Sequence, residues 1–316
     1  MITRVLIGLT VAALLPPAPS KAHGGVVAQC PAEPVMGRLI AASDLILTAR
    51  LGPDTAAIVG AVTESGYVSI PLETPTVLNG AAPATLALRH YVDRQSGSAN
   101  KALAAASGRT VTLFLVEADG AFYLASATQD AIRGADPATV QAVRTELARQ
   151  TAILGKWRVD RHLPYFDAVE RLIARLGRGT ARQQEEIFAS LERLGVAAVP
   201  AIVAQMDDRR SLVEKRISLL NHAPDAFEGI RHYGPQQIVD ALAAILNQIT
   251  GTSFGFIYNG GSDNARRAAI DAWRVYAADL SCPRAAVDQE AVASARREGM
   301  AEPLGQVRVP QGFGAA

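Results

Sequence analysis

The feature that most constrains this fold is a change in the spacing of apolar residues part-way along the chain. Up to about residue 130 they occur in short runs, and in one run Val111, Leu113 and Leu115 alternate with Thr110 and Thr112. Alternation is typical of half-buried strands. From 164 to 280 the period changes to that of a helix, about 3.6 residues. The chain is therefore predicted to be an α+β multidomain protein, with a β domain followed by an all-α domain.

The expected strands are short and are separated by turn residues. After a short helix over 33–42, strands are expected over 44–51, 67–78, 84–92 and 110–125. Within the last range, Asp119-Gly120 supplies the left-handed pair that a tight hairpin needs. Four or five strands at this spacing, with Gly and Pro between them, predict a small antiparallel barrel.

The second half begins with a connecting helix. Asp136 suits the N-cap position and Pro137 the first helical position, so a helix is expected over 137–154. The predicted divisions are a signal peptide (1–22), the barrel (23–135), a connecting helix and linker (136–163), a helical domain (164–282), and a weak helix and tail (283–316).

The first residues have the order of a secretory signal. A basic start is followed by an eleven-residue apolar run over 5–15, by two prolines, and by Ser20-Lys21-Ala22, which suits signal peptidase. The run is too short to span a bilayer. We expect cleavage after Ala22 and a periplasmic or secreted protein. Cleavage after Ala28 and an uncleaved anchor are the alternatives.

Charge and cysteine content limit the partners and the cross-links. Removing Arg4 and Lys21 leaves 31 − 2 = 29 basic against 30 acidic residues. No basic stripe stands out, so neither nucleic acid nor membrane is expected as a partner, and no membrane span is expected in the mature chain. Cys30 and Cys282 are the two cysteines. In an exported chain an even count predicts one disulfide between them, and two independent thiols are the alternative.

The first domain resembles the bacterial netrin-like, TIMP-like β-barrel of the OB class. The resemblance rests on an early cysteine (Cys30), a short helix, the run over 42–50, the strand end Val77-Leu78-Asn79-Gly80, and a hairpin over 111–124. It implies an OB-like barrel. The paired N-terminal cysteines of that family are missing from the sequence. In its metalloprotease inhibitors the mature chain begins with cysteine, whereas His23 would begin it here.

The second domain is similar to HEAT-like helical repeats of exported bacterial proteins. One repeat corner matches, over 191–202, where Pro200 starts the second helix and acidic residues follow it. The pairing of Gly251-x-x-Phe254-Gly255 with a later Trp273-Arg274 is also similar. The stretch 209–235 is irregular, so the resemblance implies a HEAT-like layer and not a regular solenoid.

Two motifs in the sequence suggest catalysis, but the residues around them do not support it. Gly251-Thr252-Ser253-Phe254-Gly255 matches the nucleophile elbow of serine hydrolases, but a helical pattern precedes it and no histidine follows Ser253. His23 could bind copper with its α-amino group and a second histidine. The candidates for that second histidine are His90, His162, His222 and His232, and none has supporting spacing. No cofactor, metal site or catalytic residue is predicted.

Aromatic residues gather in two segments of a chain that is only 5% aromatic. The predicted binding residues lie there: His232, Tyr233, Phe254, Phe256 and Tyr258. A helix over 236–250, about 22 Å long, is expected to place the two segments near its opposite ends. The alternative is that the rings only fill the ends of a thin helical layer. Trp273 is expected in the core.

Both architectures present recognition surfaces, barrels through their loops and repeats through extended faces. The expected function is therefore non-catalytic binding of a protein or peptide in the envelope or outside the cell. The alternatives are a hydrolase acting through Ser253, a metal-dependent enzyme using His23, and protease inhibition by the barrel.

Overall fold

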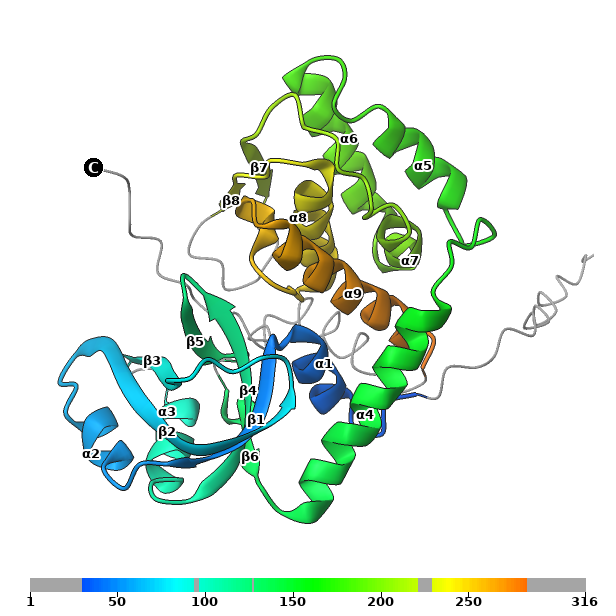
Figure 1. Ribbon diagram of the computed structural model, residues 1–316. Coiled ribbons are helices and arrows are strands. Elements are labelled where there is room, and N and C mark those ends of the chain that lie inside the picture. Colours follow the sequence, from blue (N-terminus) through cyan, green and yellow to red (C-terminus); the bar gives the residue numbers. More distant parts are fainter. Residues whose placement is uncertain (1–29, 94–96, 127, 221–228, 283–316) are drawn as a thin grey trace, which may run out of the picture.

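The computed structural model describes residues 30–93, 97–126, 128–220 and 229–282 (Figure 1). The predicted signal segment, His23, His222 and the predicted tail lie outside the described residues. The coarse fold class is confirmed, since a closed five-stranded barrel is followed by a mainly helical part.

The barrel closes through the pairing order β1-β2-β3-β5-β4-β1. Its strands are β1 (Leu45–Leu51), β2 (Ser65–Asn79), β3 (Ala87–Asp93), β4 (Thr110–Ala118) and β5 (Ala121–Leu124). A short strand, β6 (Ile132–Gly134), adds to the free part of β4. Neighbours pair antiparallel except β3 and β5, which are parallel. One parallel contact was therefore missing from the prediction of a purely antiparallel barrel.

Local turn chemistry explains two of the corners. Asp119 and Gly120 both have positive φ, 52° and 73°, and join β4 to β5 as the hairpin prediction required. Gly80, at φ 86°, follows β2, and a Cβ atom there would overlap the carbonyl oxygen of Asp44. Glycine is therefore required at this turn by conformation and by space.

Three short helices accompany the barrel. The first, α1 (Pro34–Ala42), was predicted; α2 (Thr55–Gly60) and α3 (Ser98–Ala105) were not. Helices of six and eight residues are too short to show a convincing period. The barrel core is filled by aliphatic side chains and by Phe114 and Phe122.

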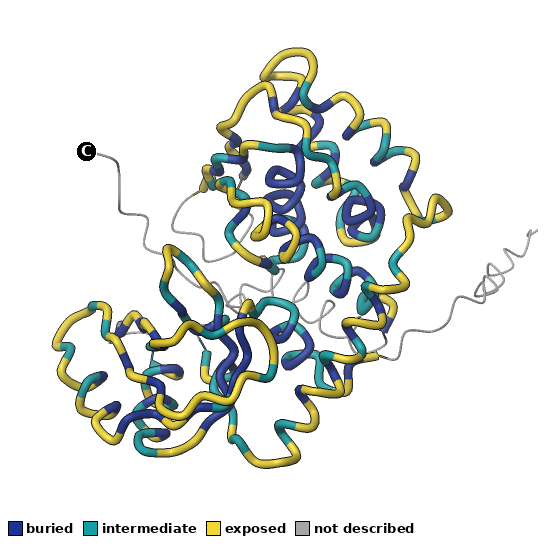
Figure 2. Tube along the Cα trace, viewed as in Figure 1, coloured by how far each residue is buried: buried dark blue, intermediate teal, exposed yellow. Residues whose placement is uncertain are grey.

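The second half is built from six α-helices in the described chain. They are α4 (Pro137–Lys156), α5 (Phe166–Ala174), α6 (Ala181–Leu194), α7 (Val199–Val203), α8 (Ile238–Thr250) and α9 (Asp263–Asp279). Single 3-10 turns lie at Gln129–Ala131, Val196–Ala198 and Ile257–Asn259. Helix α8 is buried on nearly every side (Figure 2), and Trp273 of α9 is fully buried, as predicted.

A two-stranded sheet interrupts the helices and corrects the expectation of an all-α domain. Strands β7 (Ile217–Leu220) and β8 (Ile230–Tyr233) pair antiparallel within the stretch that the sequence left irregular. Strands of four residues are at the lower limit of the length over which alternation can be recognised.

The barrel and the helical part meet where α1, α4 and α9 contact one another (Figure 1). Arg149 of α4 donates hydrogen bonds to Glu146 at 2.6 Å and to Asp279 of α9 at 2.7 Å. Gln150 donates to the carbonyl of Gly37 in α1 at 2.9 Å. Cys30 and Cys282 form a disulfide beside this junction, which confirms the predicted pairing. Within the described residues, no helix is long and apolar enough to cross a membrane.

Candidate binding surfaces

The two predicted aromatic segments meet, contrary to the expectation that α8 would hold them apart. The rings of Tyr233 and Tyr258 lie 5.5 Å apart, and Phe256 lies 6.0 Å from Tyr258. The Tyr233 hydroxyl donates to Asn247, near the C-terminal end of α8, at 3.4 Å. Strand β8 therefore runs beside α8, so the side chain of Tyr233 reaches the C-terminal end of that helix although Tyr233 precedes the helix in the sequence.

The remaining two predicted residues have different surroundings. Phe254 is buried in the core, 4.9 Å from the ring of Trp273. His232 is exposed on β8, and its Nδ1 lies 2.9 Å from the hydroxyl of Ser218 on β7. Of the five predicted binding residues, His232 alone has an exposed side chain.

Burial makes the Tyr233–Tyr258 pair chemically quiet. Burial raises the pKa of Tyr258 to about 12 and also raises the pKa of Tyr233, against the opposing charge of Arg231. Both phenols therefore stay neutral near pH 7 and are poor acid–base groups. The geometry fits a packed cluster that fixes β8 and the loop after α8.

The residues considered for catalysis are not assembled into a site. Ser253 is exposed in the loop after α8, where Gly251 ends the helix in the left-handed conformation, so the turn is helix-to-loop and not strand-to-helix. His90 is buried, bonded to Asn100 at 2.6 Å, and burial lowers its pKa. Among the described residues, no three His, Cys, Asp or Glu side chains are grouped to hold a metal ion.

A different surface lies on the outside of the barrel. We call Tyr67 of β2, Arg89 and Tyr91 of β3, and Tyr123 of β5 the tyrosine–arginine patch. Tyr67 and Tyr91 pair across the strands, with ring centroids 5.0 Å apart. Tyr123 lies 6.2 Å from Tyr67. The guanidinium carbon of Arg89 lies 4.6 Å from the centre of the Tyr67 ring and 6.0 Å from that of Tyr123.

Strand alternation turns these side chains outward. Ile70 of β2, Leu88 of β3 and Phe122 of β5 point into the barrel core and are buried. The alternate positions therefore face solvent, and Tyr67 and Tyr91 are each 40% exposed. Such exposure is unusual in a chain that is only 5% aromatic. It distinguishes the tyrosine–arginine patch from the pair of Tyr233 and Tyr258, in which Tyr233 is buried.

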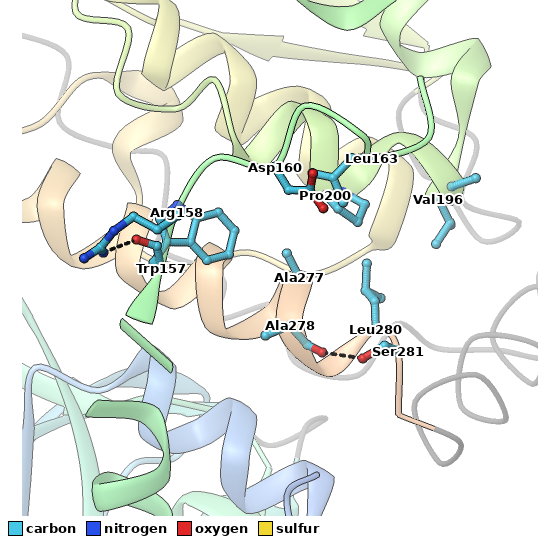
Figure 3. A pocket seen from close by; sticks show the side chains of 11 residues that line it. Trp157, Arg158, Asp160, Leu163, Val196, Pro200, Ala277, Ala278, Leu280 and Ser281 are labelled. Carbon is cyan, nitrogen blue, oxygen red and sulfur yellow. Dashed lines mark hydrogen bonds between the residues drawn. The ribbon is translucent and has the colours of Figure 1, made fainter. Parts of the chain in front are cut away.

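An apolar groove of about 530 Å³ lies in the helical part (Figure 3). Trp157 and Leu163 of the linker and Pro200 of α7 face the end of α9, where Ala277 and Leu280 complete the lining. The groove offers apolar contact next to Arg158 and Asp160 at its edge. Such a lining suits packing, and Ser281 adds one hydroxyl to it.

Comparison with known proteins assigns no function to these surfaces. No protein-family model, no curated protein and no solved structure matches the chain. The netrin-like and HEAT-like resemblances therefore remain predictions. The tyrosine–arginine patch was missed because the sequence does not show which strands are neighbours. The signal that could have indicated it is that two of the expected strands each carry a tyrosine, Tyr67 and Tyr91, on the side that faces away from the core.

Proposed function

We propose that this protein is an exported, non-catalytic binding protein whose partner is a protein or peptide. The observation that carries the proposal is the tyrosine–arginine patch, where three tyrosines and one arginine are in mutual contact on an outer barrel face. The proposed contact surface differs from the predicted aromatic segments, in which Tyr233 and Phe254 are buried and Phe256 and Tyr258 are half-buried.

The composition of the patch supports a protein partner. Tyrosine and arginine are among the residues that contribute most to protein interfaces, because they combine a large apolar area with hydrogen-bonding groups. The mutual contacts between Tyr67, Tyr91 and Arg89 restrict their side chains before a partner arrives. Prior restriction reduces the entropy lost on binding.

Export is supported by the covalent chemistry of the chain. Disulfides persist in oxidising compartments and are rare in the cytosol. The Cys30–Cys282 bond is therefore consistent with the predicted secretory signal.

We also propose the finer fold assignments that the sequence suggested. The strand order, the parallel β3–β5 contact and the position of α3 between β3 and β4 support an OB-type barrel. The corner between α6 and α7, with Pro200 in the first turn of α7, supports a HEAT-like pair. In OB-type barrels the face of strands 2 and 3 binds oligonucleotides and oligosaccharides. Tyr67, Arg89 and Tyr91 lie on these strands, so the same face is a contact surface here, and its composition favours a protein.

The function is tested by pull-down from periplasmic and culture extracts with the purified chain. A partner that is captured by the unchanged protein is expected to be lost with the variant Tyr67→Ala/Tyr91→Ala. The matched control is Tyr165→Ala, because Tyr165 is 49% exposed and lies before α5, outside the patch. Retention of every partner by the double variant would contradict the proposal.

A further inference from the structure

Arg89 has hydrogen-bonding capacity that the described part of the chain leaves unused. Its contacts there are with the tyrosine rings, and its guanidinium donates no hydrogen bond and forms no ion pair with a described residue. Two other arginines, Arg149 and Arg266, are instead held by carboxylates. Arg89 is thus a charged group that is held in place and still available to a ligand.

A cation–π contact is an attraction between the guanidinium charge and the face of the ring, and it does not saturate the five N–H donors of the group. The planar fork of these donors matches the two oxygens of a carboxylate and binds them in pairs. Because Tyr67 supports the fork at 4.6 Å, part of the ordering cost of such a bond is already met.

We propose that the tyrosine–arginine patch recognises an acidic peptide segment, in which an Asp or Glu carboxylate binds the Arg89 fork and a neighbouring apolar side chain packs on Tyr67 and Tyr91. The inference rests on the proposed binding function and names the chemistry of the partner. It also predicts that bound and unbound states differ little at the patch, since its side chains already contact one another.

Ring geometry and charge favour a peptide over other acidic polymers. The Tyr67 and Tyr91 planes are tilted by 59°, and the Tyr67 and Tyr123 planes by 75°. Rings tilted in this way are not the flat platforms on which successive bases stack. Long polyanions bind through many basic groups, whereas the patch contains one arginine and the whole chain has 31 basic against 30 acidic residues.

The test uses NMR of the tyrosine ring signals of the full chain with defined peptides. The probes are the N-acetylated, C-amidated tetrapeptide Gly-Glu-Phe-Gly and its glutamine counterpart, titrated to about 10 mM because single short peptides bind weakly. We expect the glutamate peptide to shift the signals of Tyr67 and Tyr91 saturably. The glutamine peptide should bind about tenfold more weakly, because a charge-assisted pair is lost.

Two variants distinguish paired hydrogen bonding by the planar guanidinium of Arg89 from attraction by its positive charge alone. In Arg89→Gln, the glutamate and glutamine peptides should bind with about equal affinity. Arg89→Lys keeps the charge but loses the planar fork, and should weaken glutamate-peptide binding about tenfold. Unchanged ring signals of Phe114, which is buried in the barrel core, show in each variant that the barrel is intact. Tyr67→Ala/Tyr91→Ala should weaken both peptides, because it removes the apolar contact that they share.

Each other outcome overturns the inference. Equal binding of the two peptides, full affinity in Arg89→Lys, or no shift with either peptide would remove the carboxylate contact. Stronger shifts with polygalacturonate or a single-stranded oligonucleotide than with the peptide would assign the patch to another polymer. The proposed function fails separately, when Tyr67→Ala/Tyr91→Ala still captures its protein partners.

Discussion

At the scale of single residues, burial decides how much an ion pair contributes to stability. Asp240 and Arg266 form two hydrogen bonds, of 2.7 and 2.9 Å, with side chains that are 0% and 7% exposed. The same carboxylate accepts the backbone N–H groups of Gln236 and Gln237 at the start of α8. The exposed pair of Arg182 and Glu186 makes one contact of 3.2 Å.

We therefore expect Asp240→Asn to lower the free energy of unfolding by about 3 kcal/mol, because the buried Arg266 then keeps only its longer contact, of 3.7 Å, with the exposed carboxylate of Asp263. The control Glu186→Gln should change it by less than about 0.5 kcal/mol. Urea unfolding followed by circular dichroism measures both. Similar losses in the two variants would show that the buried pair has no special role.

Substitutions at Gly80 and Gly120 distinguish the stability cost of conformational strain from that of steric overlap. Both have positive φ, but a Cβ at Gly80 would overlap Asp44, whereas at Gly120 it would have open space. Gly120→Ala should cost about 1 kcal/mol through strain alone. Gly80→Ala should cost at least about 2 kcal/mol more, since the backbone at β1 must move. Equal unfolding midpoints for the two variants would contradict the overlap.

At the scale of elements, the strength of the local signal set what could be predicted. Asp119-Gly120 at the hairpin and Asp136-Pro137 at the start of α4 act within a few residues, and both were found. Strand β8 depends on pairing with β7, which lies ten residues earlier in the chain, so its four residues were read as loop. The patch depends on the register that sets Tyr67 opposite Tyr91. Long-range pairing is not encoded in local periodicity.

A side chain distant in sequence holds the C-terminal end of α5. Arg210 donates to the carbonyls of Ala174 and Leu176 at 3.3 Å and of Ile173 at 3.0 Å, while Asp208 orients it. Helix ends leave carbonyl groups unpaired, and a cation there satisfies them. Arg210→Ala should lower the free energy of unfolding by about 2 kcal/mol and speed hydrogen exchange in α5.

The exchange measurement identifies the element, because a local cap should affect α5 before the rest of the helical part. Amides of α9 should keep their protection, and Arg182→Ala should leave the exchange of α5 unchanged. Uniform acceleration over all helices would mean that Arg210 stabilises the whole fold and not one helix end.

At the scale of the whole molecule, one covalent bond and one ionic cluster join two separate cores. Buried residues form one cluster in the barrel and another in the helical part. Cys30–Cys282 spans 252 residues and lies beside the contact of α1, α4 and α9. Arg149 holds Asp279 across the same junction. Coupling between the two cores therefore depends on this junction.

Removing the disulfide should reveal that dependence. In Cys30→Ser/Cys282→Ser the unfolded chain gains the entropy of a long loop, so the free energy of unfolding should fall by about 5 kcal/mol. Adding Arg149→Met removes the ion pair with Asp279 at the junction and should split unfolding into two transitions. Both tryptophans, Trp157 and Trp273, lie outside the barrel strands, so their fluorescence follows the helical part, whereas circular dichroism follows both parts. Separated midpoints from the two signals are the expected result. Coincident midpoints in the triple variant would show that the cores are coupled elsewhere, since two-state unfolding requires different probes to agree.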